Sequence, residues 1–270
     1  MIVALSACKK ETNSESATDA EREEKEITLL DKPVVSYETT AEILNDYELV
    51  WKDEFDGDEL DLEKWNYRAE GDTRNYAEVS RNTIHLDGEG HLVIEVTKDE
   101  EGNYFVGQTG TEGIFETTYG YFETRAKMNK GIGPHVAFWL QSPTMPRSDN
   151  NPGENGSEVD IFEYHRENPG IVHHNIHWNG YGEEHKQIGI EIENPEVDEG
   201  FHTFGLLWRE EGYTFYVDGK KTWETTEALS HRDEYMILST ELTGFGGDPK
   251  LGEYPDQVVF DYVRVYKPKK

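Results

Sequence analysis

The sequence predicts an all-β fold, a sandwich or jelly roll built from antiparallel sheets. Short segments rich in Val, Ile, Phe, Tyr and Trp alternate apolar with polar residues and end in Gly, Asn, Asp or Pro turns. Strong helical periodicity is absent along the chain, which disfavours helical alternatives. Strands are expected over residues 49–57, 83–86, 91–96, 119–128, 136–140, 158–163, 171–178, 201–208, 213–217, 235–242 and 258–266.

Alternation is clearest in the segments 119–128 and 136–140. Successive side chains of a strand point to opposite faces, so Glu123 and Arg125 point away from the expected core. Trp139 likewise points away from the neighbours that we expect to be buried. These outward side chains are therefore candidates to line a cleft.

Length and composition limit the function classes. The 270 residues suit one large all-β domain, and with 35% hydrophobic and 12% aromatic residues the core must rely on aromatic rings, which also stack on sugar faces. The net charge of −30 argues against nucleic acid and anionic membrane surfaces as partners. It also disfavours a highly sulfated polysaccharide unless a local Arg/Lys cluster offsets the field, so a neutral glycan fits better.

The N-terminal region resembles a lipoprotein leader followed by a tether. Cys8 is the only cysteine, which excludes an intrachain disulfide, and it ends the lipobox-like run Leu5-Ser6-Ala7-Cys8. We expect a signal remnant over 1–8, a disordered acidic tether over 9–46 and the folded domain over 47–268. This organisation predicts a protein lipid-anchored at Cys8 to a bacterial envelope membrane, at the outer membrane or cell surface; the alternative is an inert cysteine.

Three carboxylates crowd the strand 158–163. Glu158 and Asp160 share one face, whereas Glu163 comes one residue too late to join them. A β-bulge near Ile161-Phe162 would absorb the extra residue and return Glu163 to the acidic face. Ile161 and Phe162 would then point into the core.

Such crowding has a chemical consequence. Neighbouring carboxylates raise one another's pKa, so that one of them tends to hold a proton at neutral pH. A retaining glycosidase requires this, because one carboxylate attacks while a protonated partner about 5–5.5 Å away donates to the leaving oxygen. On these residues alone, a solvated or calcium-binding acidic strand remains an alternative.

Seven segments in the chain resemble glycoside hydrolase family 16, in the family's order, and together they cover nearly all of 47–267. They are Trp51…Glu54-Phe55, Tyr119-Gly120-Tyr121-Phe122-Glu123…Arg125, Ala137-Phe138-Trp139-Leu140, Glu158-Val159-Asp160-Ile161-Phe162-Glu163, Phe201-His202-Thr203-Phe204…Trp208, Phe215-Tyr216-Val217-Asp218-Gly219, and Asp261-Tyr262-Val263-Arg264-Val265-Tyr266. The resemblance implies a β-jelly-roll sandwich of two antiparallel sheets with a concave substrate cleft, and endo-acting cleavage of β-linked glycans with retention.

Residue roles follow from the resemblance, position by position. Glu158 corresponds to the nucleophile, Glu163 to the general acid/base and Asp160 to the residue that tunes the nucleophile. The motif with one extra residue is that of the bulged branch, which includes laminarinases, agarases, porphyranases and carrageenases. No cofactor is expected for catalysis.

The resemblance also implies substrate contacts. The candidates are Trp139, Arg125, His177, Trp178, Asn75 and His135. The competing interpretations are a core position for Trp139 and a structural ion pair between Arg125 and Glu123. A zinc site built from the histidines of 173–177 is disfavoured, because alternation puts only two of them on one face.

Glu54 and Asp261 match the side-chain positions of a structural calcium that many family members carry between the first and last strands. Two ordinary surface acids are the alternative.

One departure from the family pattern concerns His135, which stands where laminarinase-like members usually have a stacking Trp. The substrate class therefore stays open between a β-1,3-glucan and a β-galactan.

We expect a monomer that binds a polysaccharide or oligosaccharide, does not bind nucleic acid, and meets a membrane only through its lipid anchor. A non-catalytic carbohydrate-binding jelly roll and a transglycosylase that uses the same residues are the alternative functions.

Overall fold

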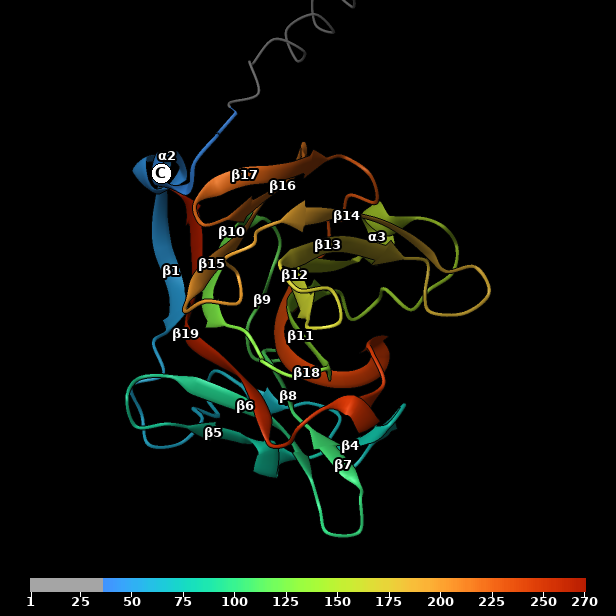
Figure 1. The fold of residues 1–270 in the computed structure, drawn as a ribbon. Helices are drawn as coiled ribbons and strands as arrows, with labels where there is room; N and C mark the ends of the chain where they lie inside the picture. The colour runs from blue at the N-terminus through green and yellow to red at the C-terminus, as the bar shows by residue number, and fades with distance from the viewer. Residues whose placement is uncertain (1–35) are drawn as a thin grey trace, which may run out of the picture. The chain divides into compact units, whose positions relative to one another are not determined.

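The computed structural model describes residues 36–270, in which two β-sheets pack face to face, as the all-β prediction requires (Figure 1). The first sheet has 11 strands in the order β17-β16-β15-β10-β19-β6-β7-β4-β3, with β1 paired to β19 and β5 to β6. Its strands are β1 (Tyr47–Asp53), β3 (Thr73–Arg74), β4 (Ala77–Val79), β5 (Ile84–Leu86), β6 (Leu92–Lys98), β7 (Tyr104–Val106), β10 (Gly120–Lys127), β15 (His202–Arg209), β16 (Gly212–Val217), β17 (Lys220–Thr225) and β19 (Asp256–Pro268). Its pairs are antiparallel except β4 with β7.

The second sheet has eight strands in the order β14-β13-β12-β11-β18-β8-β2, with β9 paired to β18. Its strands are β2 (Asn66–Tyr67), β8 (Gln108–Gly110), β9 (Glu116–Thr117), β11 (Gly133–Gln141), β12 (Glu158–His165), β13 (Ile171–Trp178), β14 (Lys186–Glu193) and β18 (Glu234–Gly246). Short helices complete the described chain: α2 (Thr40–Asp46), α3 (Pro152–Asn155) and the 3₁₀ turns η1 (Arg81–Thr83) and η2 (Pro249–Leu251). We call this second sheet the cleft sheet, because β11, β12 and β18 carry the acidic pocket described below.

Aromatic side chains fill the space between the two sheets, as the composition predicts. Phe162 of the cleft sheet meets Phe204 of the opposite sheet with ring centroids 4.1 Å apart. Trp208 and Phe122 stack nearby and have no solvent exposure. Because burying each large aromatic ring removes a wide apolar area from water, this layer fixes how the cleft sheet sits on its partner.

The folded unit begins before residue 47, so the tether predicted over 9–46 is too long. The compact unit runs from Tyr37 to Lys270. Helix α2 buries Ile43 completely, in a small cluster with Tyr47 and Tyr216. Ile43 is the buried side chain of this short helix, whose other residues stay exposed or partly exposed, so the polar composition of the segment was misleading. Residues 1–35, including Cys8, lie outside the described residues.

No helix within residues 36–270 is both long and apolar enough to cross a membrane.

Candidate active site

The bulge predicted in the acidic strand is present. On the β11 side, Phe162 pairs with Phe138 and Asp160 pairs with Trp139, which leaves Ile161 without a counterpart. Ile161 and Phe162 both have no solvent exposure, so two successive side chains point into the core. The extra residue returns the carboxylate of Glu163 to the face that carries those of Glu158 and Asp160.

The three carboxylates line one pocket of the cleft sheet. Its other walls are Arg68, Arg74, His135, Ala137, Trp139, Tyr181, Ser239 and Glu241. A second pocket adjoins it at Glu163 and is lined by β13, β14 and the end of β18, including His173, Asn175 and Phe245. Glu163 therefore lines both pockets.

Glu158 is held through one of its two oxygens. Gln141 Nε2 donates to Oε2 over 2.9 Å, and the Tyr181 hydroxyl donates to the same atom. Burial, followed by the charge of Asp160, raises the pKa of Glu158 to about 8. The group is therefore mostly protonated at neutral pH in the free protein.

Glu163 is held through both oxygens. His135 Nε2 lies 2.8 Å from Oε1, and Asn175 Nδ2 donates to Oε2. The His135 contact is close but outside hydrogen-bond geometry, so we treat it as an ion pair. Burial alone would raise the pKa of Glu163, but His135 and then Asn175 outweigh it and bring that pKa to about 2.

Asp160 lies between the two glutamates. Burial and the charge of Glu163 raise its pKa well above the ordinary range. His177 Nε2 lies 3.3 Å from Asp160 Oδ2, and His177 Nδ1 contacts His185 Nε2 at 2.9 Å. These pKa shifts favour protons on Glu158 and Asp160 and an ionised Glu163 beside His135.

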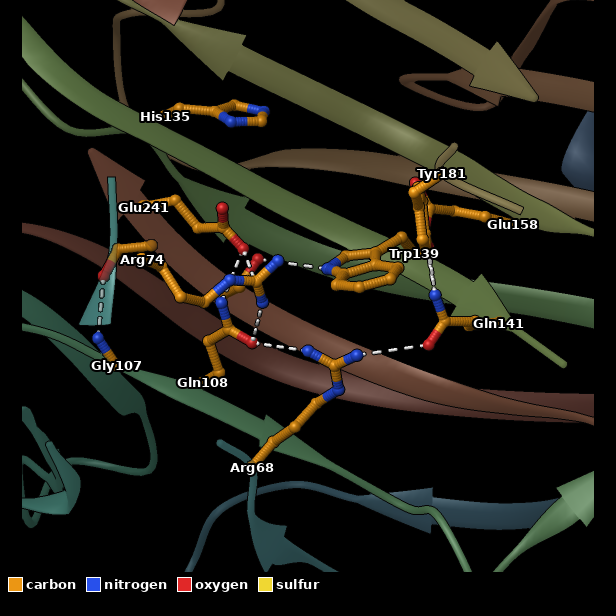
Figure 2. Close-up of polar contacts among 12 residues, drawn as sticks. Arg68, Arg74, Gly107, Gln108, His135, Trp139, Gln141, Glu158, Tyr181 and Glu241 are labelled. Carbon is orange, nitrogen blue, oxygen red and sulfur yellow. Dashed lines mark hydrogen bonds and ion pairs between the residues drawn. The ribbon is translucent and has the colours of Figure 1, made fainter. Parts of the chain in front are cut away.

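Among the sequence candidates, Trp139 and His135 do reach the pocket. Trp139 is only 6% exposed, and its Nε1 donates to Ser239 Oγ over 3.0 Å. The guanidinium of Arg68 lies over the indole, 5.0 Å from the ring centroid (Figure 2). One face of this ring is therefore covered by a cation rather than open to a sugar.

Three predicted substrate contacts do not line the acidic pocket. Arg125 belongs to β10 in the opposite sheet, where it pairs with Asp261 at 2.5 Å and covers the ring of Phe201. Trp178 points away from its neighbour His177 and packs on the main core instead. Asn75 is an exposed turn residue with a φ of 54° between β3 and β4.

Several residues of the site were not predicted. Figure 2 shows Arg68 donating to Gln108 and Gln141, and Arg74 donating to Gln108 and pairing with Glu241. In the described part of the chain Arg68 forms no ion pair with a carboxylate, so neutral amides hold its charge. These arginines and Tyr181 come from short strands and loops that lack a periodic pattern, whereas Asn175 lies two residues before His177 in β13 and so shares its face of the strand.

Both side chains predicted as calcium ligands are paired with arginines. Both oxygens of Glu54 accept from Arg264, over 2.9 and 2.8 Å, and Asp261 is engaged by Arg125. Among the described residues, the acidic and histidine side chains that converge within 4.8 Å are those of Glu158, Asp160 and His177. Since two of these are carboxylates of the acidic pocket, their grouping needs no metal to explain it.

A two-sheet sandwich with a bulged, three-carboxylate strand along its cleft defines a glycoside hydrolase. The chain belongs to glycosyl hydrolases family 16, whose sequence model matches residues 72–255. The β-glucanase of Rhodothermus marinus is 30% identical over 250 residues, covering 82% of this chain and 85% of its own length. The glucan endo-1,3-β-glucosidase A1 of Niallia circulans is 27% identical and matches 81% of this chain, which spans only 38% of that protein.

The solved structure of the laminarinase from Rhodothermus marinus has the same architecture. It superimposes with a TM-score of 0.71 at 28% identity, covering 83% of this chain and 98% of that one. The jelly-roll arrangement expected from the sequence is therefore confirmed, with the acidic strand on the cleft sheet.

Proposed function

We propose that this protein is an endo-acting retaining β-glycosidase that hydrolyses a polysaccharide by double displacement. The observation that carries the proposal is the bulge in β12, which brings Glu158, Asp160 and Glu163 to one pocket. This chemistry requires two carboxyl groups in one cleft, one ionised to attack the sugar and one protonated to donate to the leaving oxygen.

In the first step, a carboxylate oxygen of Glu158 attacks the anomeric carbon. The glycosidic C–O bond breaks, and a proton on Glu163 passes to the leaving oxygen. In the second step, Glu163 removes a proton from a water molecule whose oxygen attacks the same carbon. The bond to Glu158 then breaks, so both glutamates end as they began.

The free protein holds its protons differently from the reactive state. Glu158 is mainly protonated and Glu163 ionised, whereas reaction needs the reverse. Both distributions carry one proton on the two glutamates, so the change is a transfer and requires no net uptake. His135, 2.8 Å from Glu163, has a raised pKa and can hold a second proton beside the acid position.

The substrate class is a β-1,3-glucan or a β-galactan. The names of the relatives support the glucan. Two features of this cleft favour a more polar sugar, namely His135 in place of a stacking Trp and the Arg68 guanidinium over Trp139. A screen of laminarin, lichenan, agarose and porphyran, read by product mass, separates these classes.

Two variants test the assignment of roles. Glu158→Gln keeps the shape of the side chain but not its charge, and we expect kcat to fall at least about 1,000-fold with an unchanged melting temperature. Glu163→Ala should spare aryl glycosides with good leaving groups and recover rate with azide. Exposed Glu89→Gln, on a distant hairpin, is the control. Full activity of Glu158→Gln would refute the proposal.

The alternatives are distinguished by products. A carbohydrate-binding module would bind the polysaccharide without forming new reducing ends, and nothing in such a module requires three carboxylates in one pocket, two of them buried. A transglycosylase would transfer the sugar from Glu158 to an added acceptor rather than to water. Mass analysis with and without acceptor sugars identifies it.

We also propose export and lipid attachment through Cys8, supported by the lipobox-like run before it. Metabolic labelling with a radioactive fatty acid should mark the native protein but not Cys8→Ala. For calcium, we propose that Arg264 and Arg125 neutralise Glu54 and Asp261, so that no cation is needed between the first and last strands.

A further inference from the structure

A loop outside the acidic motif reaches the nucleophile side of the pocket. Residues 179–185 connect β13 to β14 and rest on the loop 142–156. Asn150 N donates to Asn179 Oδ1 over 2.6 Å, and Gly180 N donates to the carbonyl of Met145 over 3.1 Å. A Cβ on Gly180 would lie 2.8 Å from the Pro146 carbonyl oxygen, at a φ of +73°, so only glycine fits this close approach.

Tyr181 carries the loop's first contact with the site. Its side chain is 57% exposed, yet its hydroxyl donates to Glu158, which is only partly exposed. An exposed tyrosine gains little from burial, so its position is explained by the polar contact rather than by packing. Figure 2 shows Tyr181 beside Glu158 on the side of Trp139.

The contact selects one oxygen of Glu158. Tyr181 and Gln141 both donate to Oε2, and no side chain in the described part of the chain donates to Oε1. Oε1 is thus left to face the sugar. An attacking carboxylate needs this arrangement, in which one oxygen is fixed and the other is free to form a bond.

His185 carries the second contact, behind Asp160. Its Nε2 lies 2.9 Å from His177 Nδ1, and His177 Nε2 lies 3.3 Å from Asp160 Oδ2 in a contact that, like that of His135 with Glu163, is outside hydrogen-bond geometry. If His177 Nε2 bears the proton that faces Asp160, its Nδ1 is the acceptor and His185 Nε2 the donor. Burial and the nearby His177 lower the pKa of His185, which keeps it neutral for this role.

We propose that loop 179–185 is a positioning element for the nucleophile, in which Tyr181 fixes Oε2 of Glu158 and His185 fixes the tautomer of His177 that faces Asp160. The inference rests on the role proposed for Glu158. It assigns the loop to catalysis through Glu158 and Asp160, not to direct contact with the reacting atoms.

Tyr181→Phe tests the first arm, with the full chain and the polysaccharide found in the screen. Loss of a hydrogen bond to a charged group should lower kcat by about 10- to 100-fold while KM changes less than about threefold. The acidic limb of kcat/KM should move to higher pH, because the Tyr181 hydrogen bond helps to keep Glu158 ionised. The titratable groups around Glu158 that remain in both proteins are Arg68, Asp160, Glu163, His177 and Glu234.

Tyr119→Phe is the matched control, since it removes a tyrosine hydroxyl that contacts His231 outside the cleft, at 2.9 Å. It should behave as the unmodified protein. His185→Ala tests the second arm and should lower kcat, whereas His185→Gln, which retains an N–H donor, should recover part of the rate. A melting temperature near that of the unmodified protein shows that each variant is folded.

An unchanged kcat and an unchanged acidic limb in Tyr181→Phe would overturn the inference, as would equal rates for His185→Ala and the unmodified protein. If these variants keep full activity while Glu158→Gln is inactive, only the role of the loop is refuted. If Glu158→Gln is itself fully active, the proposed function fails instead.

Discussion

His135 offers the sharpest test of how the site manages its protons. Its Nε2 lies 2.8 Å from Glu163 Oε1, and its ring meets Phe245 edge-on with centroids 5.1 Å apart. The ring is buried, which by itself lowers its pKa, but Glu163 and then Glu241 and Asp160 raise that pKa above the ordinary 6.5. The change His135→Phe keeps the ring and removes the charge.

The effect of this change on the pH dependence of the rate depends on which group holds the proton that is donated to the leaving oxygen. In the unmodified protein the His135–Glu163 pair retains a proton until the pH rises through the raised pKa of His135, above 6.5. In the variant, Glu163 must hold that proton alone, with an ordinary pKa of 4.5 that burial raises and Asn175 lowers. The basic limb should therefore move to lower pH, and the rate at pH values above both limbs should fall about tenfold for each pH unit of that shift.

The assay is kcat/KM on an oligosaccharide with a poor leaving group, measured from pH 4 to about 10. His165→Phe is the control, because the His165 ring also packs on Phe245 but burial and His173 hold its pKa at about 4, so it is already neutral. The other groups that face His135, namely Asp160, Glu241 and His173, are the same in both variants. A basic limb that stays in place or rises in His135→Phe would refute the reasoning.

Two further predictions concern packing and ions. In Gly189→Ala, the new Cβ would lie 1.8 Å from Asn175 Oδ1 and 2.6 Å from the His174 carbonyl oxygen, so the Asn175 side chain must move away from Glu163. We expect the free energy of unfolding, measured by denaturant titration, to fall by about 1–3 kcal/mol. We also expect a lower kcat in steady-state kinetics. Gly182→Ala, with no atom within 4 Å, should retain the original stability, and a Gly189→Ala protein as stable as the original would contradict the packing argument. EDTA should leave the melting temperature within about 1 °C, whereas Arg264→Met should cost about 1 kcal/mol, by calorimetry; a large drop in EDTA that calcium reverses would restore the calcium site.

The acidic strand could be predicted because its rule is local. A period of two residues places Glu158 and Asp160 together, and a late Glu163 demands one bulge, which the register with β11 confirms. Alternation also predicted correctly that Arg125 points away from the core. Alternation does not indicate to which of the two sheets a strand belongs, and Arg125 lies on the sheet opposite the cleft.

Other failures have different physical causes. Strand β14 contains a clear alternation at Ile188, Ile190 and Ile192, which the strand prediction overlooked. Tyr181 and Arg68 could not be found this way, because their positions depend on contacts between loops distant in sequence, such as that of Asn150 with Asn179. A pattern in one segment carries no information about such pairings.

The arrangement of charge explains how a protein of net charge −30 maintains this pocket. Three carboxylates with Glu241 beside them would repel one another strongly if all were ionised. The pocket avoids this by keeping protons on Glu158 and Asp160 and by pairing Arg74 with Glu241 and His135 with Glu163.

Arg68 is then the cation without a carboxylate partner in the described pocket, held by the amides of Gln108 and Gln141. Because no carboxylate in this pocket neutralises the Arg68 guanidinium, it can donate hydrogen bonds to oxygens of a bound sugar, from the side of Trp139. The surface of the protein is therefore negative overall, whereas the cleft presents a positive guanidinium to its ligand. A glycan selected by this site must suit a local guanidinium, even though the protein as a whole repels anions.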